Sequence, residues 1–409
     1  MYVSRPAPEL FPARIGNDAL ADAGSIEVFD AVVIGGGPAG SAAAFTLASG
    51  GASVCLIDKS DFPRDKLCGG GVTGRGRSVF ESVFGRSWDG RLFLPSADIE
   101  FRSNGRLIGG ATDQTGVFLT MRRDFDEYLL GLARAAGATL MLKTRIARVD
   151  LAHGALTPGD GAEIRFRHLV GADGVNSMVA KALCGAAFLP ATIGFGLEVE
   201  VPRDHLPEQG DRLEIDFSAA SWGYGWVFPK HRTHTIGVAG IHARNPDMKA
   251  RLADYLALKN LDAANYRVKG QYIPFGDYRR RPGRDNVLLA GDAAGFADPI
   301  TGEGIAFAMQ SGAAAGRAIL DSLASPGVVP ADRYFSEISG LTRGFRDARF
   351  WRWLIYPAPV HGLFTRAFSR AGVLQRGYLD ILAGRREYDA LPGLFARQAG
   401  RALKRLARL

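Results

Sequence analysis

Cysteine is scarce in this chain of 409 residues, which contains only Cys55, Cys68 and Cys184. Three scattered cysteines are too few for a disulfide framework, and no pair of them has the spacing of metal ligands. We therefore expect a reducing compartment and no bound metal.

Long hydrophobic runs are also missing. The longest apolar stretch, residues 290–323, is interrupted by Asp292, Asp298 and Glu303, so it cannot form a continuous membrane span. The polar N-terminal residues contain no apolar core of signal-peptide length. These absences predict a cytoplasmic protein, and they leave open a peripheral contact with the inner face of the membrane.

The composition otherwise describes a globular protein. Hydrophobic residues make up 47% of the chain, and its length accommodates two or three domains with sizeable cores. The formal net charge of +8 would attract nucleic acid, an anionic membrane or an anionic small molecule. Charge alone does not choose between these partners.

A βαβ unit follows a loosely ordered N-terminal extension, residues 1–27. Residues 31–34 form a buried-strand run, residues 39–48 an alanine-rich helix, and residues 53–57 a second strand. Between the first strand and the helix lies Gly35-Gly36-Gly37-Pro38-Ala39-Gly40, which contains G-x-G-x-x-G. The motif stands in the strand–turn–helix context that dinucleotide binding requires.

Each residue of this motif has a physical role. Gly35 permits a tight turn, Gly37 lets the backbone approach a pyrophosphate, and Gly40 allows close helix packing. The helix N-terminus offers its amides to the anion. Asp58 ends the second strand, where a carboxylate accepts from a ribose 2′-hydroxyl and would repel a 2′-phosphate. The site therefore suits FAD or NAD and disfavours NADP; the alternative is a glycine turn beside a surface aspartate.

Two later motifs favour FAD, because they resemble those of flavoprotein hydroxylases. Residues 171–174, Gly-Ala-Asp-Gly, resemble the Asp-Gly motif of that superfamily. Residues 286–295, which include Gly291 and Asp292, resemble its Gly-Asp motif. The resemblance implies that Asp292 binds the ribityl chain.

The segment after Asp292 continues this resemblance. Backbone amides near Pro299, Gly302 and Gly304 are expected at the flavin pyrimidine edge. A helix N-terminus at Gly304-Ile305 would supply positive potential where the reduced flavin becomes anionic.

A helix start is predicted at Asp124, which would cap a helix with an acidic first turn. Arg122, just before it, matches a position where arginine reaches the FAD in the superfamily. Its neighbour Arg123 could do the same. The alternative for both arginines is a solvated pair at the helix start.

Three specific segments resemble the geranylgeranyl reductase family. Residues 224–229, Tyr-Gly-Trp-Val-Phe-Pro, resemble its Tyr-x-Trp-x-Phe-Pro signature, and residues 62–70 resemble its Pro-Arg-x-Lys-x-Cys-Gly segment. Residues 298–305 match its version of the Gly-Asp region. The resemblance extends from Phe29 to about Tyr388 and is generic between these segments.

This resemblance implies an FAD-dependent oxidoreductase that saturates C=C bonds of a prenyl group in lipid biosynthesis. It implies a prenyl lipid or prenyl diphosphate as substrate, no nucleic-acid partner, and NADPH or a reduced ferredoxin as electron donor. The predicted cofactor-binding residues are Gly35, Gly37, Pro38, Ala39, Gly40, Asp58, Lys59, Arg64, Cys68, Gly69, Arg122, Asp173, Gly291, Asp292, Pro299, Gly302, Gly304 and Ile305.

The predicted fold class is α/β, with a Rossmann-type FAD-binding domain, an inserted antiparallel β-sheet substrate domain and a helical C-terminal region. The alternating, aromatic-rich pattern of residues 193–273 favours a separate sheet. The predicted limits are 28–90, 118–185 and 280–325 for the FAD-binding domain, 91–117 and 186–279 for the substrate domain, and 326–409 for the helical region.

Reduction of an isolated alkene needs a proton on one carbon as positive charge develops on the other. Tyr224 and Trp226 share a strand face and could stabilise that charge through cation–π attraction. Cys68 and Tyr224 can both donate a proton. Each of the three could instead be structural, since alternating aromatic residues often pack in a core. His231 and His234 flank a turn and are expected to be solvated.

The C-terminal residues from Phe395 to Arg408 have the pattern of a basic amphipathic helix. Such a helix could lie on anionic lipid or pack on the protein with a solvated basic face. Two other functions remain open at this point. One is an aromatic monooxygenase that traps O2 on the flavin, and the other is a non-enzymatic prenyl-lipid carrier.

Overall fold

The computed structural model describes residues 27–96, 98–112, 116–159 and 161–393. Nearly all of the predicted N-terminal extension, and the predicted basic helix from Phe395, lie outside the described residues. The described strands form sheets of eight, seven and three strands, and helices pack against them. The predicted α/β class is confirmed.

The eight-stranded sheet has a parallel centre in the order β18, β11, β1, β2, β8. Residues that follow α3 return to this sheet, because β8 pairs with β2 and β11 pairs with β1. The strands are β1 Glu27–Ile34, β2 Val54–Ile57, β8 Thr139–Met141, β9 Ile146–Asp150, β10 Ala155–Pro158, β11 Ile164–Gly171, β17 Gly283–Arg284 and β18 Val287–Leu289.

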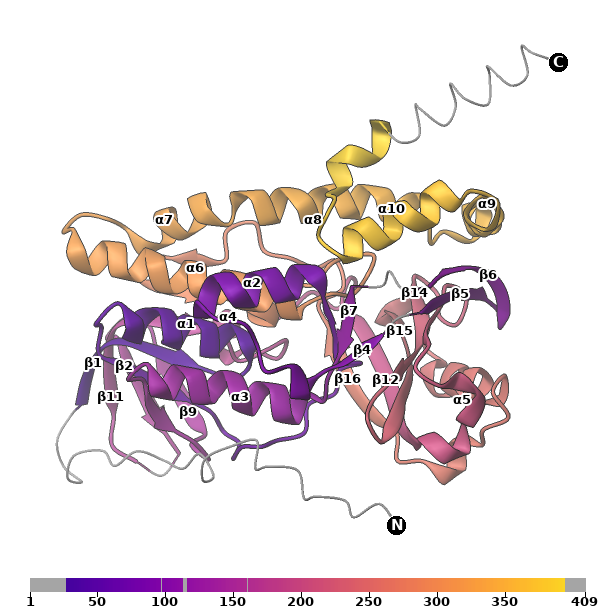
Figure 1. Ribbon diagram of the computed structural model, residues 1–409. Coiled ribbons are helices and arrows are strands. Elements are labelled where there is room, and N and C mark those ends of the chain that lie inside the picture. The colour runs from indigo at the N-terminus through magenta and orange to yellow at the C-terminus, as the bar shows by residue number, and fades with distance from the viewer. Residues whose placement is uncertain (1–26, 97, 113–115, 160, 394–409) are drawn as a thin grey trace.

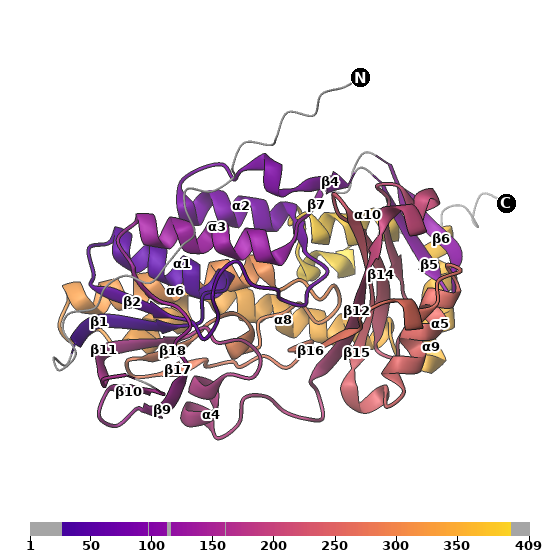
Figure 2. The ribbon, with the colours of Figure 1, turned by 90° about the horizontal axis from the view of Figure 1, so that it is seen from below.

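Helices α1, α2, α3 and α6 pack on one another beside the eight-stranded sheet (Figure 1), whereas α4 lies apart from them and contacts β9, β11 and β18 (Figure 2). Close packing of α1 on α6 depends on small residues, since a Cβ on Gly312 would meet the Ala39 carbonyl oxygen at 2.0 Å. The helices are α1 Pro38–Ser49, α2 Gly74–Phe84, α3 Arg122–Ala135, α4 Met178–Cys184 and α6 Ile305–Ala324.

The predicted N-cap of α3, Asp124, lies three residues after the observed one. The helix begins at Arg122, its N-cap is Met121, and no side chain caps it. Arg122 belongs to the first turn because its guanidinium pairs with the buried carboxylate of Asp126 one turn later. Arg122 is therefore a buried residue of the helix and not a solvated residue before it.

The seven-stranded sheet has the order β16, β12, β15, β14, β13, β5, β6. Its pairs are antiparallel except β13 with β5. Helix α5, Met248–Ala257, packs against β12 and β15. The strands are β5 Ile99–Ser103, β6 Arg106–Ala111, β12 Gly194–Pro202, β13 Leu213–Asp216, β14 Gly223–Pro229, β15 Thr233–Ile241 and β16 Lys269–Ile273.

His234 corrects one expectation, because it lies on β15 between two paired strands and is fully buried. Burial lowers the pKa of its imidazole to about 4. The ring is thus neutral inside the sheet and is not a solvated turn residue.

A small sheet of β3 Gly71–Thr73, β7 Val117–Leu119 and β4 Leu94–Ser96 lies between the two large sheets (Figure 2). The predicted helical segment after residue 323 begins with α7 Pro330–Glu337 and α8 Ser339–Trp351. It continues with α9 Ala358–Arg370 and α10 Gly372–Leu382. In Figure 1 these helices form a layer along one side of the molecule, over both large sheets.

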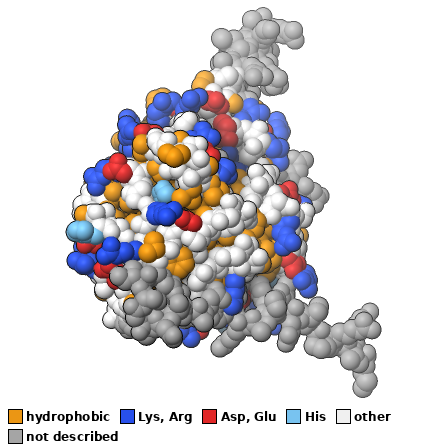
Figure 3. Space-filling view, turned by 90° about the vertical axis from the view of Figure 1, so that its left-hand side faces the viewer, with side chains coloured by type: hydrophobic (Ala, Val, Ile, Leu, Met, Phe, Trp, Pro, Cys, Tyr) orange, Lys and Arg blue, Asp and Glu red, His pale blue; other side chains and the backbone are white. Residues whose placement is uncertain are grey.

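No helix in the described ranges is both long and apolar enough to cross a membrane. The face shown in Figure 3 carries basic side chains spread around hydrophobic ones rather than gathered into one basic patch. The predicted domain limits stay a prediction.

Candidate functional site

One cavity, with a volume of about 640 Å³, collects residues from segments that are far apart in the sequence. Its lining includes the turn between β1 and α1, the loop of residues 64–71, strand β14 and the turn of residues 301–305. The carboxyl ends of parallel strands supply one end of this cavity, which is where ligands bind in open α/β sheets.

The turn after β1 leaves no room for side chains at two glycines. Gly35 has φ +107°, and a Cβ there would lie 2.3 Å from the Ala172 carbonyl oxygen. A Cβ on Gly40 would lie 1.7 Å from the Gly35 carbonyl oxygen. Gly40 thus lies behind the cavity, where it lets α1 pack against the turn.

Gly37 faces open space between two guanidinium groups. A Cβ there would have an Arg64 nitrogen at 3.6 Å and an Arg122 nitrogen at 4.0 Å. Gly37 is also the N-cap of α1, and no side chain caps the helix. Uncapped helix amides between two arginines form a cradle for an anion such as a pyrophosphate.

Asp58 lines the cavity and directly follows β2. Its Oδ2 accepts from the Gly36 amide at 2.7 Å, and its Oδ1 accepts from the Ser60 amide at 2.8 Å. These bonds fix the carboxylate beside the glycine turn, in the place expected for a ribose ligand.

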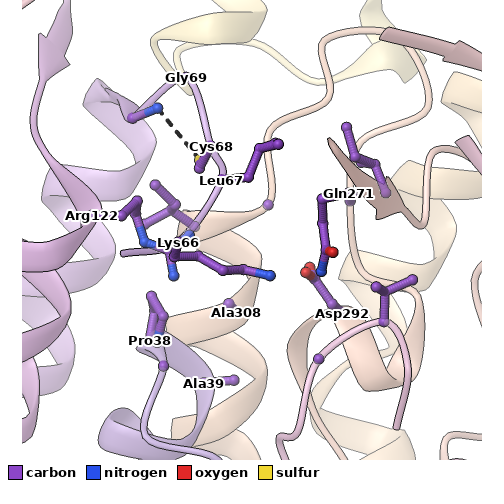
Figure 4. Close-up of a pocket in the computed structure, with 18 of the residues that line it drawn as sticks. Pro38, Ala39, Lys66, Leu67, Cys68, Gly69, Arg122, Gln271, Asp292 and Ala308 are labelled. Carbon is purple, nitrogen blue, oxygen red and sulfur yellow. Dashed lines mark hydrogen bonds between the residues drawn. The ribbon is translucent and has the colours of Figure 1, made fainter. Parts of the chain in front are cut away.

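A second uncapped helix start lies at Gly304, the N-cap of α6. The nearest atom to a Cβ placed there is Asp292 Oδ1, at 3.7 Å. Lys66 extends toward Asp292 across the cavity (Figure 4). Burial lowers the pKa of Lys66, and the charge of Asp292 partly opposes this effect.

The loop that carries Cys68 is held by buried charges that sequence reasoning missed. Glu198 Oε1 accepts from the Cys68 amide at 3.1 Å, and Lys230 Nζ donates to the Gly69 carbonyl. The Gly70 amide donates to Cys68 Sγ at 3.4 Å. Lys230 follows the aromatic signature directly, but nothing in the sequence around Glu198 marks it.

Glu198 and Lys230 are 4% and 3% exposed. Burial, and then the nearby charge of Glu200, raises the pKa of Glu198 to about 7. Burial lowers the pKa of Lys230 to about 8 against the opposing charges of Cys68, Glu200 and Glu198. Both groups therefore titrate near neutral pH behind the loop.

Arg122 also interacts with Cys68. Its Nε and Nη2 donate to Asp126 at 2.6 and 2.8 Å. Burial opposes the charged form, but Asp126 and then Cys68 outweigh it, so the pKa of Arg122 is raised. Of the two arginines left open by the sequence, Arg122 lines the cavity.

Tyr224 and Trp226 lie on one face of β14, with ring centroids 6.1 Å apart, and both line the cavity. The Tyr224 hydroxyl donates to the Thr301 carbonyl at 2.5 Å. Burial raises the pKa of Tyr224. The indole nitrogen of Trp226 is buried and has no hydrogen-bond partner among the described residues.

Glu303 is a further titratable group of the cavity wall. Thr73 Oγ1 donates to its carboxylate, and Arg75 Nε lies 3.8 Å from Glu303 Oε2. Burial raises the pKa of Glu303 to about 7 in spite of both contacts. In the sequence, only its place directly before Gly304 indicates that Glu303 could belong to the site, and the sequence analysis assigned it no role.

The cavity brings together all three predicted catalytic residues, Cys68, Tyr224 and Trp226. It is also lined by every predicted cofactor-binding residue except Gly40, Gly291 and Pro299. Gly291 has φ +59°, and a Cβ built on it would lie 2.9 Å from the Cβ of Ala39. Gly291 therefore serves close packing against α1. The Asp173 carboxylate lines the cavity but accepts from the Ser177 hydroxyl at 2.5 Å and the Met178 amide at 2.7 Å.

The other end of the cavity is apolar. Besides Trp226, its lining side chains come from β7, β13, β14 and α10, and they are Val117, Leu213, Ile215, Phe228, Tyr378 and Leu382. An apolar, aromatic-lined space suits a hydrophobic ligand.

Comparisons with known proteins define the class. The family described as FAD dependent oxidoreductase matches residues 30–181, which contain the glycine turn, the Cys68 loop and Arg122. This protein is an FAD-dependent oxidoreductase, and the anion cradle, Asp58 and the two uncapped helix starts fit that cofactor.

Relatives define the family more closely. The chain is 31% identical to digeranylgeranylglycerophospholipid reductase of Methanoculleus marisnigri, over 69% of this chain and 74% of that protein. It is 30% identical to menaquinone reductase of Mycobacterium tuberculosis, over 78% of this chain and 82% of that protein. The chain belongs to the geranylgeranyl reductase family.

A solved structure shares the fold. A geranylgeranyl bacteriochlorophyll reductase-like protein from Thermoplasma acidophilum superposes with a TM-score of 0.67 at 21% identity, over 85% of this chain and 89% of that chain.

Proposed function

We propose that this protein saturates C=C bonds of a geranylgeranyl or other prenyl group in lipid biosynthesis. One observation carries the proposal: a single cavity joins the cradle at Gly37 to an apolar end walled by Trp226, Phe228 and Leu382. A prenyl chain is long and apolar, so it would gain free energy by leaving water for that end. Relatives with reductase names at about 30% identity support the same reaction class.

The predicted cofactor-binding residues would hold FAD along the cavity, and FAD, when bound, supplies hydride-transfer chemistry. The eight-stranded sheet and its helices would be the FAD-binding domain, and the seven-stranded sheet the substrate domain. NADPH or a reduced ferredoxin would be the electron donor.

Trp226 and Tyr224 would border the reacting alkene. Their ring faces attract the positive charge that develops on carbon as the other carbon is protonated, by about 0.5–2 kcal/mol for each ring. The Tyr224 hydroxyl is engaged by the Thr301 carbonyl, which fixes the ring and makes its proton hard to release.

Cys68 is then the better candidate to influence proton delivery, because its thiol lies at the cavity wall and its backbone is held from behind by Glu198 and Lys230. Glu303 is a second candidate, since a carboxyl group with a pKa of about 7 is partly protonated at neutral pH. The rates of alkene reduction by Cys68→Ser and Glu303→Gln variants, compared at full flavin content, would show which of the two residues influences proton delivery.

Anaerobic incubation tests the reaction. The purified protein, reduced with dithionite, is given geranylgeranyl diphosphate, a digeranylgeranyl glycerophospholipid or menaquinone, and products are read by mass spectrometry. We expect two hydrogens to be added per double bond reduced, without O2. A product that carries oxygen and forms only in the presence of O2 would show an aromatic monooxygenase instead. Flavin-loaded protein that leaves every prenyl substrate unchanged would contradict the proposal.

A further inference from the structure

Exposed hydrophobic side chains concentrate where α8 meets α9. Among the described residues, four of the ten large hydrophobic side chains that are exposed lie within residues 350–363. They are Phe350, Trp353, Leu354 and Leu363, with exposed fractions of 65%, 58%, 49% and 69%. Trp353 and Leu354 belong to a short 3-10 turn, Arg352–Leu354, that contacts both helices. Clusters of this kind mark interaction surfaces.

The same segment is strongly basic. Residues 339–376 contain seven arginines and a single acidic residue, Asp347. Six of these arginines are exposed, and they are Arg343, Arg346, Arg349, Arg366, Arg370 and Arg376. The surface therefore combines exposed aromatic and aliphatic groups with an excess of positive charge.

A chain of ring contacts connects this segment to the cavity. Trp353 lies edge-on to Trp222 with centroids 4.6 Å apart, and Trp222 stacks on Tyr356 at 6.4 Å. Tyr356 contacts Phe275 at 6.2 Å, and Phe275 lines the cavity. Helix α10, which packs on α9, supplies Tyr378 and Leu382 to the apolar end. Trp353 of the exposed cluster is thus linked through ring contacts to the cavity wall at Phe275, and the neighbouring helix α10 contributes to the apolar end.

We propose that the α8–α9 surface, defined as Phe350, Trp353, Leu354 and Leu363 with their neighbouring arginines, docks on a lipid bilayer that carries anionic headgroups. Tryptophan with arginine is the composition favoured at the boundary between headgroups and acyl chains, where the ring is buried and the guanidinium reaches phosphate. This inference deepens the proposed function, because a prenyl-lipid substrate would reach the apolar end from that bilayer.

Charge argues against a second copy of the chain as the occupant. Two such surfaces would bring their arginines together with one Asp347 on each side, and like charges oppose association. Anionic headgroups instead gain from every exposed arginine, by about fivefold in affinity for each charge near the surface.

Vesicle flotation of the full chain tests the proposal. Vesicles of equal parts phosphatidylcholine and phosphatidylglycerol are compared with phosphatidylcholine alone. The charge variant is Arg366→Glu with Arg370→Glu, and its control is Lys249→Glu with Arg267→Glu, an equal change on exposed residues elsewhere. The apolar variant is Phe350→Ser with Leu354→Ser, and its control is Leu189→Ser with Leu258→Ser, which are exposed by 58% and 57%.

We expect the parent to float with the anionic vesicles, each variant to bind at least tenfold more weakly, and each control to stay within twofold of the parent. Flavin content reports folding in every case. Parent-like binding by both variants would overturn the proposal, as would a parent that does not bind. Variants that turn a dimer into a monomer without vesicles would show a self-association surface instead. Reduction of a detergent-dispersed substrate is measured separately, so the proposed function and this surface can fail independently.

Discussion

The two ends of the cavity are built in different ways. The end around Gly37 is made mainly by backbone, namely glycines that exclude side chains and the uncapped amides of α1, with the side chains of Arg64 and Arg122 on either side. The end around Trp226 is made by side chains from β7, β13, β14 and α10, which meet only in the folded chain. A backbone site is specified by a few adjacent residues, whereas a side-chain site depends on the packing of the whole molecule.

The largest expected effect breaks the backbone end. In Gly40→Ala the new Cβ would lie 1.7 Å from the Gly35 carbonyl oxygen, so the turn must move. We expect a loss of stability of about 4 kcal/mol or more and protein that purifies without flavin colour. Gly344→Ala, a helical glycine whose Cβ would meet no atom within 4 Å, is the control and should retain its flavin. Normal flavin absorbance in Gly40→Ala would contradict this account of the turn.

The next largest effect is a loss of stability, and it distinguishes Arg122 from Arg123. Arg122→Met leaves the fully buried Asp126 without its main partner, although Arg64 lies 3.2 Å away, and should lower the free energy of unfolding by about 3 kcal/mol. Arg123→Met removes a half-exposed arginine 3.5 Å from Asp124 and should cost about 0.5 kcal/mol or less. Urea denaturation measures both. Equal losses would mean that the two arginines are equivalent.

These two positions also show how far sequence reasoning reaches. The glycine turn and the place of Asp58 after the second strand could be predicted, because both depend on local sequence, whereas the choice of FAD over NAD depended on the resemblance of residues 171–174 and 286–295 to flavoprotein motifs. The start of α3 was placed wrongly at Asp124, because the buried pair of Arg122 with Asp126 is a tertiary feature. A candidate capping residue in the sequence does not show whether the residues before it also belong to the helix.

Buried charge was equally hard to predict. Glu198 occupies one position in an alternating strand, and its burial depends on the Cys68 loop, 130 residues earlier, packing over it. His234 was expected in solvent because it stands near a turn, yet β15 is flanked by β12 and β14. In both cases the decisive neighbour is remote in sequence. The domain limits and the residues after 393 stay predictions.

Glu198 offers a pH-dependent test of the polar brace behind the Cys68 loop. Burial raises its pKa to about 7 from the ordinary value of 4.5, so the neutral form is favoured in the folded state. Its contribution to stability is therefore present below pH 4.5 and is lost as the pH rises through about 7. Glu198→Gln cannot ionise and keeps an oxygen for the Cys68 amide.

The stability of the variant relative to the parent should therefore rise by on the order of 2–3 kcal/mol between pH 4.5 and 8. Urea denaturation across that range measures the difference, and Glu208→Gln, at an exposed position, is the control. A constant difference across the range would show that the pKa of Glu198 is not raised in the folded protein.

The smallest effect tests the side-chain end. Trp226→Leu keeps an apolar wall but removes the aromatic face, so loss of about 1.4 kcal/mol of charge stabilisation would slow alkene reduction about tenfold. Tyr224→Phe keeps its ring and loses only the hydrogen bond to the Thr301 carbonyl, so it should slow the reaction less. Single-turnover rates on reduced enzyme separate this step from flavin reduction. Because neither residue belongs to the backbone cradle, both variants should purify with full flavin. A Trp226→Leu enzyme that reduces prenyl chains at the parental rate would show that the aromatic wall only shapes the cavity, and a colourless one would show that the two ends are not independent.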